Sequence, residues 1–405
     1  MTVREDSSRA ANPPPQAEVG ATLRELAVAA FASALSMRVC DPMLPRIAEQ
    51  FDRPITDLSG VVTAFAVAYG LFSLIHGPLG DRRGKLESIA VATVVAALGS
   101  LACWLAWSPT SLIAFRFLTG AACAGLIPLS LAWIGDSVPL ADRQRTLARF
   151  GAAAVTGLIA GQVIGGLFAD AIGWRSAFLL PSAMFGFAGV RLFRSMRARA
   201  GSAHRVEPTG VMAGYRALLR NPRARFLMLT VAVEGASAFG ILAFIPTYLH
   251  LRFELPLWHA GLLVALYGVG GLLFALQAGL IIRRLGPASM ARAGGLALLA
   301  GFGAVAFAPM WPVAASGCAL AGFGFSMLHN TLQTGATQAH PQARGTAIAG
   351  FAMSLFVGQS IGVAVSASLV ERLGFTAVFT ALGTVLAVIG LIVHRANVRS
   401  GSAAA

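Results

Sequence analysis

The chain has 405 residues, of which 56% are hydrophobic and only 12% are charged, and its mean hydropathy is +0.72. An average soluble domain carries roughly 25% charged residues, so this composition excludes a soluble enzyme, a nucleic-acid-binding domain and a secreted disulfide scaffold, and it leaves a polytopic membrane protein. The net charge of +14 could suggest a nucleic-acid surface, but the placement of the basic residues indicates otherwise.

Apolar runs long enough to cross a membrane recur twelve times along the chain. A helix needs about 20 mostly apolar residues to span the hydrocarbon layer, and the runs do not alternate apolar with polar residues as membrane β-strands do. The sequence therefore predicts an all-α polytopic membrane protein with twelve transmembrane helices. They are expected near residues 24–47, 57–79, 86–107, 110–135, 147–170, 174–194, 224–250, 257–282, 289–308, 311–337, 345–370 and 375–394.

The basic residues indicate the orientation of these spans. Most of the 31 Lys and Arg fall in alternate connections, including Arg82, Arg83 and Lys85 and the long segment from Arg191 to Arg225. Cytoplasmic loops accumulate Lys and Arg, so we expect both termini in the cytoplasm. The positive excess then reflects topology, and no nucleic-acid partner is expected.

The sequence contains two related halves. Gly161-Gln162-Val163-Ile164-Gly165 in the first half is matched by Gly358-Gln359-Ser360-Ile361-Gly362 in the second, at a spacing of about 200 residues. This repeat predicts two pseudo-symmetric six-helix bundles with a substrate site between them near the bilayer midplane. The predicted segments are a disordered cytoplasmic tail over 1–22, bundles over 23–194 and 223–396, a cytoplasmic linker over 195–222 and a second cytoplasmic tail over 397–405.

The first span carries a buried-charge candidate. Arg38 and Asp41 are three residues apart and share one helix face, and ionisable residues inside a membrane span are functional candidates by default. Asp41 is expected to carry a proton or contact substrate, with a neutralised structural pair as the alternative.

The connection between the second and third spans carries a family signature. It reads Gly77-Pro78-Leu79-Gly80-Asp81-Arg82-Arg83-Gly84-Lys85, which matches the pattern G-x-L-x-D-R-x-G-[RK], and over about 23–396 the chain resembles the major facilitator superfamily. The resemblance implies a cytoplasmic gate that latches the outward-facing state; the alternative is a basic loop that only sets topology. The gate residues are Gly77, Leu79, Asp81, Arg82, Gly84 and Lys85.

The fourth span contains Arg116 in an R-x-x-x-G pattern similar to that of proton-linked members of the family. The resemblance implies that Arg116 assists proton transfer by interacting with an acidic group. The alternative is an arginine that extends its side chain to the membrane boundary.

Small residues form one face of the fifth span at Gly157, Gly161 and Gly165, followed by Gly166, and such a face lets two helices pack closely. The pattern resembles the antiporter motif of the family, but Gln162 stands where proline is expected. Glutamine does not kink a helix as proline does, so uptake remains an alternative to export. Gln359 occupies the equivalent place in the repeat, and we expect the two glutamines to face each other or a central cavity.

Two later spans add polar candidates. Glu234 in the seventh span has no neutralising neighbour in sequence, so it is a candidate coupling group, or else a partner of Arg116 or Arg38. The tenth span adds three polar residues, His329, Asn330 and Gln333, and His329 and Gln333 lie one helical turn apart. These residues are expected to line a cavity or to form hydrogen bonds between helices.

The combined interpretation is a secondary transporter in a bacterial inner membrane, expected to export a small organic molecule by proton-coupled alternating access. Proton-linked uptake of a small metabolite is the main alternative, and a non-transporting membrane sensor or scaffold is another. The expected partners are a small-molecule substrate, protons and the lipid bilayer, and the chain is expected to act as a monomer. Phosphate-loop, dinucleotide, metal-ligand and catalytic-triad patterns are absent from the sequence, so neither enzymatic activity nor a cofactor or metal is expected.

Overall fold

A computed structural model describes residues 16–198, 216, 218–339 and 344–402, and every element in this part of the chain is helical. Twelve stretches within it are long and apolar enough to cross a membrane, which confirms the predicted number of spans. The first half contains α1 (Gln16–Arg38), η1 (Asp41–Met43), α2 (Leu44–Phe51), α3 (Ile55–Leu58), α4 (Gly60–Arg83), α5 (Lys85–Trp104), α6 (Pro109–Cys123), α7 (Leu126–Ser137), α8 (Leu140–Ala171), η2 (Trp174–Phe178) and α9 (Leu179–Ala198). The second half contains α11 (Pro222–Leu242), α12 (Ile245–Phe253), α13 (Leu257–Ala306), α14 (Trp311–Ala339), α15 (Arg344–Leu373) and α16 (Phe375–Ser402).

Several spans are interrupted helices. Proline lacks the amide hydrogen that continues a helix, and Pro42 and Pro45 divide the first span into α1, η1 and α2. Element α13 contains two spans, Leu257–Gly286 and Ala288–Ala306, and the chain turns between them at Gly286, whose φ of 70° is not helical. Proline thus divides one span, and a glycine bend accommodates the turn between two others.

The predicted tails and linker lie partly outside the described residues. Helix α1 begins at Gln16, inside the segment assigned to the first tail, while residues 1–15 are outside the described part. Helix α16 continues to Ser402, into the segment assigned to the second tail. Of the predicted linker, residues 199–215 and 217 are not described.

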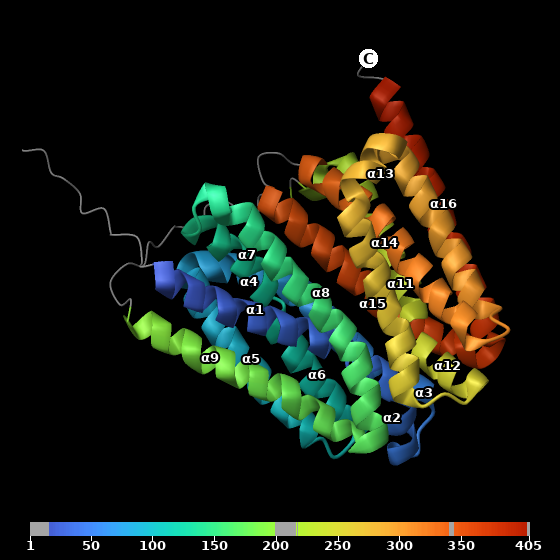
Figure 1. The fold of residues 1–405 in the computed structure, drawn as a ribbon, viewed down its shortest axis with the longest axis horizontal. Coiled ribbons are helices and arrows are strands. Elements are labelled where there is room, and N and C mark those ends of the chain that lie inside the picture. Colours follow the sequence, from blue (N-terminus) through green and yellow to red (C-terminus); the bar gives the residue numbers. More distant parts are fainter. Residues whose placement is uncertain (1–15, 199–215, 217, 340–343, 403–405) are drawn as a thin grey trace, which may run out of the picture.

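The two halves form separate helical bundles (Figure 1). Their backbones repeat the same departures from helical geometry. Asp52 and Glu254 are the two described non-glycine residues with positive φ, and they end α2 and α12 at a spacing of about 200 residues. The positive-φ glycines at 84 and 286 and at 173 and 374 are spaced alike. The internal repeat in the sequence therefore corresponds to a repeated backbone path.

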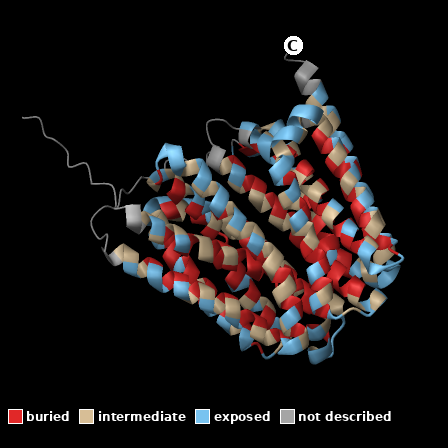
Figure 2. Cartoon of the chain, viewed as in Figure 1, coloured by how far each residue is buried: buried red, intermediate tan, exposed pale blue. Residues whose placement is uncertain are grey.

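Buried residues lie in the interior of both bundles, and exposed residues lie on the outside (Figure 2). Many of the outer residues are large and apolar, among them Trp107 at 74% and Leu276 at 83% exposure. A soluble surface would avoid so many exposed apolar side chains. The outer face is therefore suited to contact with lipid tails.

Glycines bring particular helices into backbone contact. A β-carbon at Gly157, Gly161 or Gly165 of α8 would collide with a main-chain oxygen of the span that begins with α1. In the second half, Gly358 and Gly362 of α15 meet the backbone of α11 in the same way. The close pairing of α8 with α1 therefore recurs as the pairing of α15 with α11.

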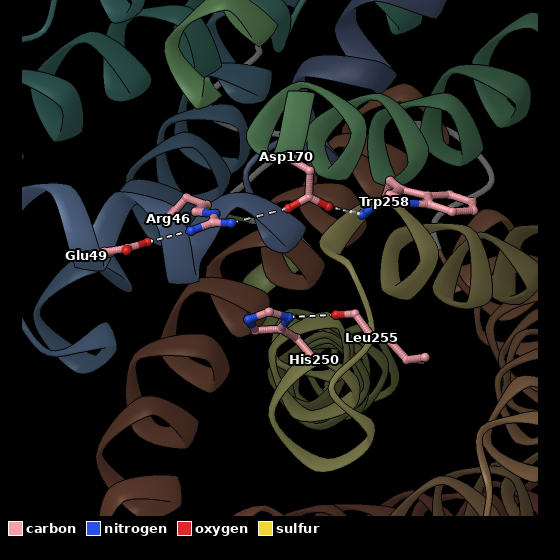
Figure 3. A network of polar contacts seen from close by, with 6 residues as sticks. All are labelled: Arg46, Glu49, Asp170, His250, Leu255 and Trp258. Carbon is pink, nitrogen blue, oxygen red and sulfur yellow. Dashed lines mark hydrogen bonds and ion pairs between the residues drawn. The ribbon is translucent and has the colours of Figure 1, made fainter. Parts of the chain in front are cut away.

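The bundles meet at one end of the molecule, formed by α2, α3, α12 and the adjoining ends of α8 and α13, which we call the closed end. Figure 3 shows its polar network. Asp170 of α8 accepts a 3.0 Å hydrogen bond from the backbone N–H of Trp258, at the start of α13 in the other bundle. Arg46 lies 3.8 Å from Asp170 and donates a 2.8 Å hydrogen bond to Glu49. Within the second bundle, His250 donates a 2.6 Å hydrogen bond to the carbonyl of Leu255.

Candidate functional site

Asp41 is the centre of a buried polar cluster in the first bundle. Its side chain has no exposed surface; Arg38 Nη1 lies 3.5 Å from its Oδ2, and the Gln162 amide donates a 3.0 Å hydrogen bond to the same oxygen. The other carboxylate oxygen, Oδ1, has no hydrogen-bond partner among the described residues. A buried charge is stable only when paired and hydrogen-bonded, so Arg38 and Gln162 together hold this carboxylate.

Local structure explains the geometry of this cluster. Helix α1 ends at Arg38, and the tight turn of η1 begins at Asp41, directly before Pro42. The close contact of Gly161 with α1 then brings the neighbouring Gln162 within reach of the carboxylate. The polar cluster therefore depends on the proline-broken span and on the glycine face of α8.

Arg38 also contacts the second bundle. Its guanidinium lies 4.4 Å from the centre of the Phe239 ring of α11, a distance at which a cation is attracted to the ring face. Phe239 in turn packs against Phe325 of α14. A change in the charge around Arg38 would therefore alter a contact between the two bundles.

A cavity of about 340 Å³ lies beside this cluster, between the two bundles. Residues from α1, α8, α11, α13, α14 and α15 line it, and Arg38 is the only charged side chain among those described residues. Its volume is in the range of small-molecule binding pockets. A substrate site between the bundles stays a prediction of the sequence repeat, and this cavity is the candidate for it.

The second bundle has its own buried carboxyl. Glu234 of α11 is fully buried, and one of its oxygens lies 3.0 Å from His329 Nδ1 of α14. The His329 ring stacks on Phe325 at 5.0 Å and approaches Phe351 at 5.2 Å. The geometry brings Glu234 and His329 together and provides neither Arg116 nor Arg38 as an ion-pair partner for Glu234 among the described residues.

Arg116 is buried inside the first bundle, with 1% of its surface exposed. Its guanidinium donates hydrogen bonds to the carbonyl oxygens of Val61 (3.1 Å) and Ser36 (2.8 Å) and lies 4.3 Å from the centre of the Phe65 ring. It does not extend to the membrane boundary, and it forms no ion pair with a described acidic residue. The side chain joins α6 to α4 and α1.

The gate motif covers the last turns of α4, Gly84 and the first residue of α5. Gly84 has a φ of 97°, which permits the turn into α5. Lys85 pairs with Asp136 of α7, whereas Asp81 and Arg82 are exposed and make no ion pair with described residues. The observed charge pair of the motif therefore lies within the first bundle.

The remaining polar candidates lie outside the described cavity lining. Gln359 is buried and its Oε1 has no described partner, Asn330 is half-buried, and Gln333 is exposed. Of the two glutamines related by the repeat, only Gln162 lines the cavity. His329 reaches the site through its contacts with Glu234 and Phe325.

Sequence reasoning missed the aromatic residues of the cavity. Phe239, Tyr267, Phe325 and Phe356 line it, and the Tyr267 hydroxyl has no described hydrogen-bond partner. Aromatic residues at helical spacing are also typical of packed cores, so their spacing alone could not have identified them. The tyrosine was the one available signal, because a phenol inside an apolar span normally has a hydrogen-bond partner.

Comparisons with known proteins agree with this architecture. The family model described as Major Facilitator Superfamily matches residues 26–349. An uncharacterized MFS-type transporter of Bacillus subtilis, YceJ, is 24% identical over 368 residues, covering 89% of this chain and 92% of its own. The multidrug export protein EmrB of Escherichia coli K12 is 28% identical over 155 residues, which are 38% of this chain and 30% of EmrB.

A solved structure shows the same fold. The crystal structure of the nucleoside transporter NupG has a TM-score of 0.73 at 14% identity and covers 92% of this chain and 98% of that chain. This likeness in fold and the family match lead to the same conclusion. The chain belongs to the Major Facilitator Superfamily of membrane transporters.

Proposed function

We propose that this transporter exports a small organic molecule by alternating access coupled to protons. The observation that carries the proposal is the inter-bundle cavity of about 340 Å³ beside the buried Arg38–Asp41 pair. Similarity to EmrB, whose name describes a multidrug export protein, supports export as the direction.

Two buried carboxyls are the coupling candidates. Asp41 and Glu234 are both fully buried, and each has one oxygen without a described hydrogen-bond partner. Adding a proton to Asp41 removes the charge that holds Arg38, and Arg38 contacts Phe239 across the bundle boundary. Adding a proton to Glu234 changes its contact with His329 in the same way. Protonation at either site therefore alters contacts that line or adjoin the cavity.

The orientation follows from the basic residues. Helix α1 begins and α16 finishes at the end of the molecule away from α2 and α12 (Figure 1). The basic gate segment at Arg82, Arg83 and Lys85 connects α4 to α5 away from the closed end. With basic loops on the cytoplasmic side, the closed end faces outward, both termini face the cytoplasm of a bacterial inner membrane, and this conformer faces inward.

Proton-linked uptake is the second candidate. Gln162 replaces the proline of the antiporter motif, and its amide holds Asp41 in place. An unbroken α8 over Leu140–Ala171, with a glutamine that donates a hydrogen bond to the carboxyl, differs from the kinked helix that the motif implies. This observation favours a coupling site built for joint binding of proton and substrate.

Everted membrane vesicles with an imposed pH gradient test the proposal. Chloramphenicol, xylose and 1-naphthoate serve as probes, and proton movement is followed with a pH-sensitive dye. Export coupled to protons requires at least one probe to enter while protons leave, whereas joint movement identifies the second candidate. Probe entry with no proton movement would contradict both.

Substitutions then test the coupling groups. Glu234→Gln and Asp41→Asn are each expected to retain exchange of the probe in the absence of a gradient. The variant at the site that couples transport to protons is expected to lose gradient-driven accumulation of the probe. Glu371→Gln is the matched control, because Glu371 is an exposed carboxyl at the far end of α15. If both buried-site variants accumulate probe as the parent does, the assignment of Asp41 and Glu234 is wrong.

A further inference from the structure

The cavity lining has an unusual distribution of charge for a site next to a carboxylate. Asp41 is fully buried behind Arg38 and Gln162 and is not among the residues that line the cavity; Glu234 is also fully buried and absent from the lining. Arg38 is therefore the only charged side chain that an occupant meets among the described residues. Positive charge, and no negative charge, is presented to the occupant.

Arg38 has donor capacity to spare. The residue is 5% exposed, and its Nη1 has no hydrogen-bond partner among the described residues, because Asp41 Oδ2 at 3.5 Å lies outside good hydrogen-bond geometry. A guanidinium has five N–H donors, arranged to bind a carboxylate with two parallel bonds. Nη1 itself is enclosed by protein, so an anionic group in the cavity would bind through the remaining N–H donors of the guanidinium, which lines the cavity.

The rest of the lining is suited to an aromatic ring. Phe239, Phe325, Phe356 and Tyr267 line the cavity from four helices, α11, α14, α15 and α13. Aromatic rings prefer edge-to-face or offset contacts with one another, and the Phe239 and Phe325 rings already lie 5.3 Å apart at 62°. The Tyr267 hydroxyl and Gln162 Oε1, both without described hydrogen-bond partners, are further polar groups on residues of this lining.

We propose that the cavity binds an aromatic carboxylic acid as its anion, with the carboxylate on Arg38 and the ring among Phe239, Phe325 and Tyr267. The inference deepens the proposed transport function by naming a substrate class, and it holds for either direction of transport. An organic cation is disfavoured, because it would enter an apolar space beside a guanidinium with no carboxylate in the lining.

Asp41 competes with the substrate for Arg38. When Asp41 is charged, part of the positive charge of Arg38 is already neutralised. When that negative charge is removed, the full positive charge of Arg38 is available to the ligand. Asp41→Asn should therefore strengthen the binding of an anion and weaken the binding of a cation. A proton on Asp41 has the same effect, so an acid of this class would bind together with a proton, and for these substrates the inference supports the second candidate, joint movement, over exchange.

Calorimetry on the purified full-length protein in lipid nanodiscs tests the inference without any transport step. Three probes of similar shape are compared: 1-naphthoate, its neutral amide 1-naphthamide and the cation 1-naphthylmethylammonium. We expect 1-naphthoate to bind at least tenfold more tightly than the amide and the cation to bind most weakly. Equal binding of all three, or tightest binding of the cation, would overturn the inference.

Variants assign the effect to Arg38. Arg38→Gln should reduce naphthoate affinity to that of the amide, Arg38→Lys should restore part of it, and Asp41→Asn should raise it several-fold. Arg372→Gln is the matched control, because Arg372 is exposed at the end of α15 and makes no ion pair with described residues. Naphthoate affinity that is unchanged in Arg38→Gln, or lowered in Asp41→Asn, would contradict the assignment.

The three-probe comparison on the parent protein remains decisive if Arg38→Gln does not fold. Binding of naphthoate with the expected charge preference, but with no proton movement in vesicles, would support the inference and contradict proton coupling. Proton-coupled movement of chloramphenicol or xylose without naphthoate binding would support proton coupling and contradict the proposed substrate class. The two outcomes separate the failure of the substrate class from the failure of the proposed function.

Discussion

Arg116 shows how a buried charge is accommodated without an ion pair to any acidic residue that the structure describes. Two carbonyl oxygens and the Phe65 ring surround the guanidinium, at 3.1, 2.8 and 4.3 Å. The carbonyls belong to α4 and the span of α1, so the arginine links three helices of the first bundle. A charged donor in such surroundings stabilises the fold by a few kcal/mol at most, since its own desolvation offsets much of the gain.

Replacing this arginine separates a packing role from the proton role that the family pattern implies. Arg116→Gln removes both carbonyl hydrogen bonds and the ring contact, so we expect a loss of about 2 kcal/mol in stability, measured as a lower midpoint of thermal unfolding in detergent. Arg372→Gln should leave the midpoint unchanged. Unchanged stability of Arg116→Gln together with lost proton coupling would instead support a direct role in proton transfer.

Residue-level prediction from the sequence succeeded where partners are close in the chain. The spacing of Arg38 and Asp41 predicts that they lie close together, and the structure places their side chains 3.5 Å apart, although α1 ends at Arg38 and Asp41 lies in η1, so they do not share one helix. The pairing of Asp41 with Gln162 and of Glu234 with His329 could not be predicted, because it depends on which helices pack together. The aromatic lining was missed for the same reason, as its residues come from four separate helices.

At the scale of elements, glycine decides which helices approach most closely. A β-carbon on Gly161 would lie 2.6 Å from the carbonyl oxygen of Leu35 and 3.1 Å from the β-carbon of Arg38. These distances are shorter than van der Waals contact, so α8 and α1 would have to separate. The separation would draw Gln162 away from Asp41 and thereby affect the buried cluster.

Gly161→Ala is therefore expected to destabilise the bundle by about 1–3 kcal/mol through overpacking. Gly151 lies on the same helix, and a β-carbon added there would have no atom within 4 Å, so Gly151→Ala is a matched control that should be neutral or slightly stabilising. Thermal unfolding in detergent gives the comparison. Equal midpoints for the two variants would show that the close contact at Gly161 is relaxed at little cost in free energy.

Element boundaries were predictable to within several residues because apolar length and proline carry the signal. The first predicted run, 24–47, corresponds to a span over Val19–Phe51, and Pro42 and Pro45 mark its interruption. The eighth and ninth predicted runs, 257–282 and 289–308, correspond to spans over Leu257–Gly286 and Ala288–Ala306, and the non-helical φ of Gly286 marks the turn between them.

At the scale of the whole molecule, a polar contact joins the bundles at the closed end (Figure 3). Asp170 accepts a 3.0 Å hydrogen bond from Trp258 N–H, at the N-terminus of α13, where a negative charge also interacts favourably with the helix dipole. Arg46 lies 3.8 Å from the same carboxylate and holds it from the first bundle. Alternating access requires these contacts to break when the closed end opens.

Asp170→Ala removes the acceptor and the charge together, so it should destabilise the present conformer relative to the outward-open one. The expected effect is about 1 kcal/mol, roughly a fivefold change in the ratio of the two states. Spin labels at Arg53→Cys and Arg372→Cys, on opposite bundles near the closed end, would report a larger population of long distances. Asp142→Asn, an exposed carboxyl at the start of α8, is the control and should leave the distribution unchanged. An unchanged distribution in Asp170→Ala would mean that close packing contacts, such as that of Gly166 with the backbone of Leu257, hold the closed end without the carboxylate.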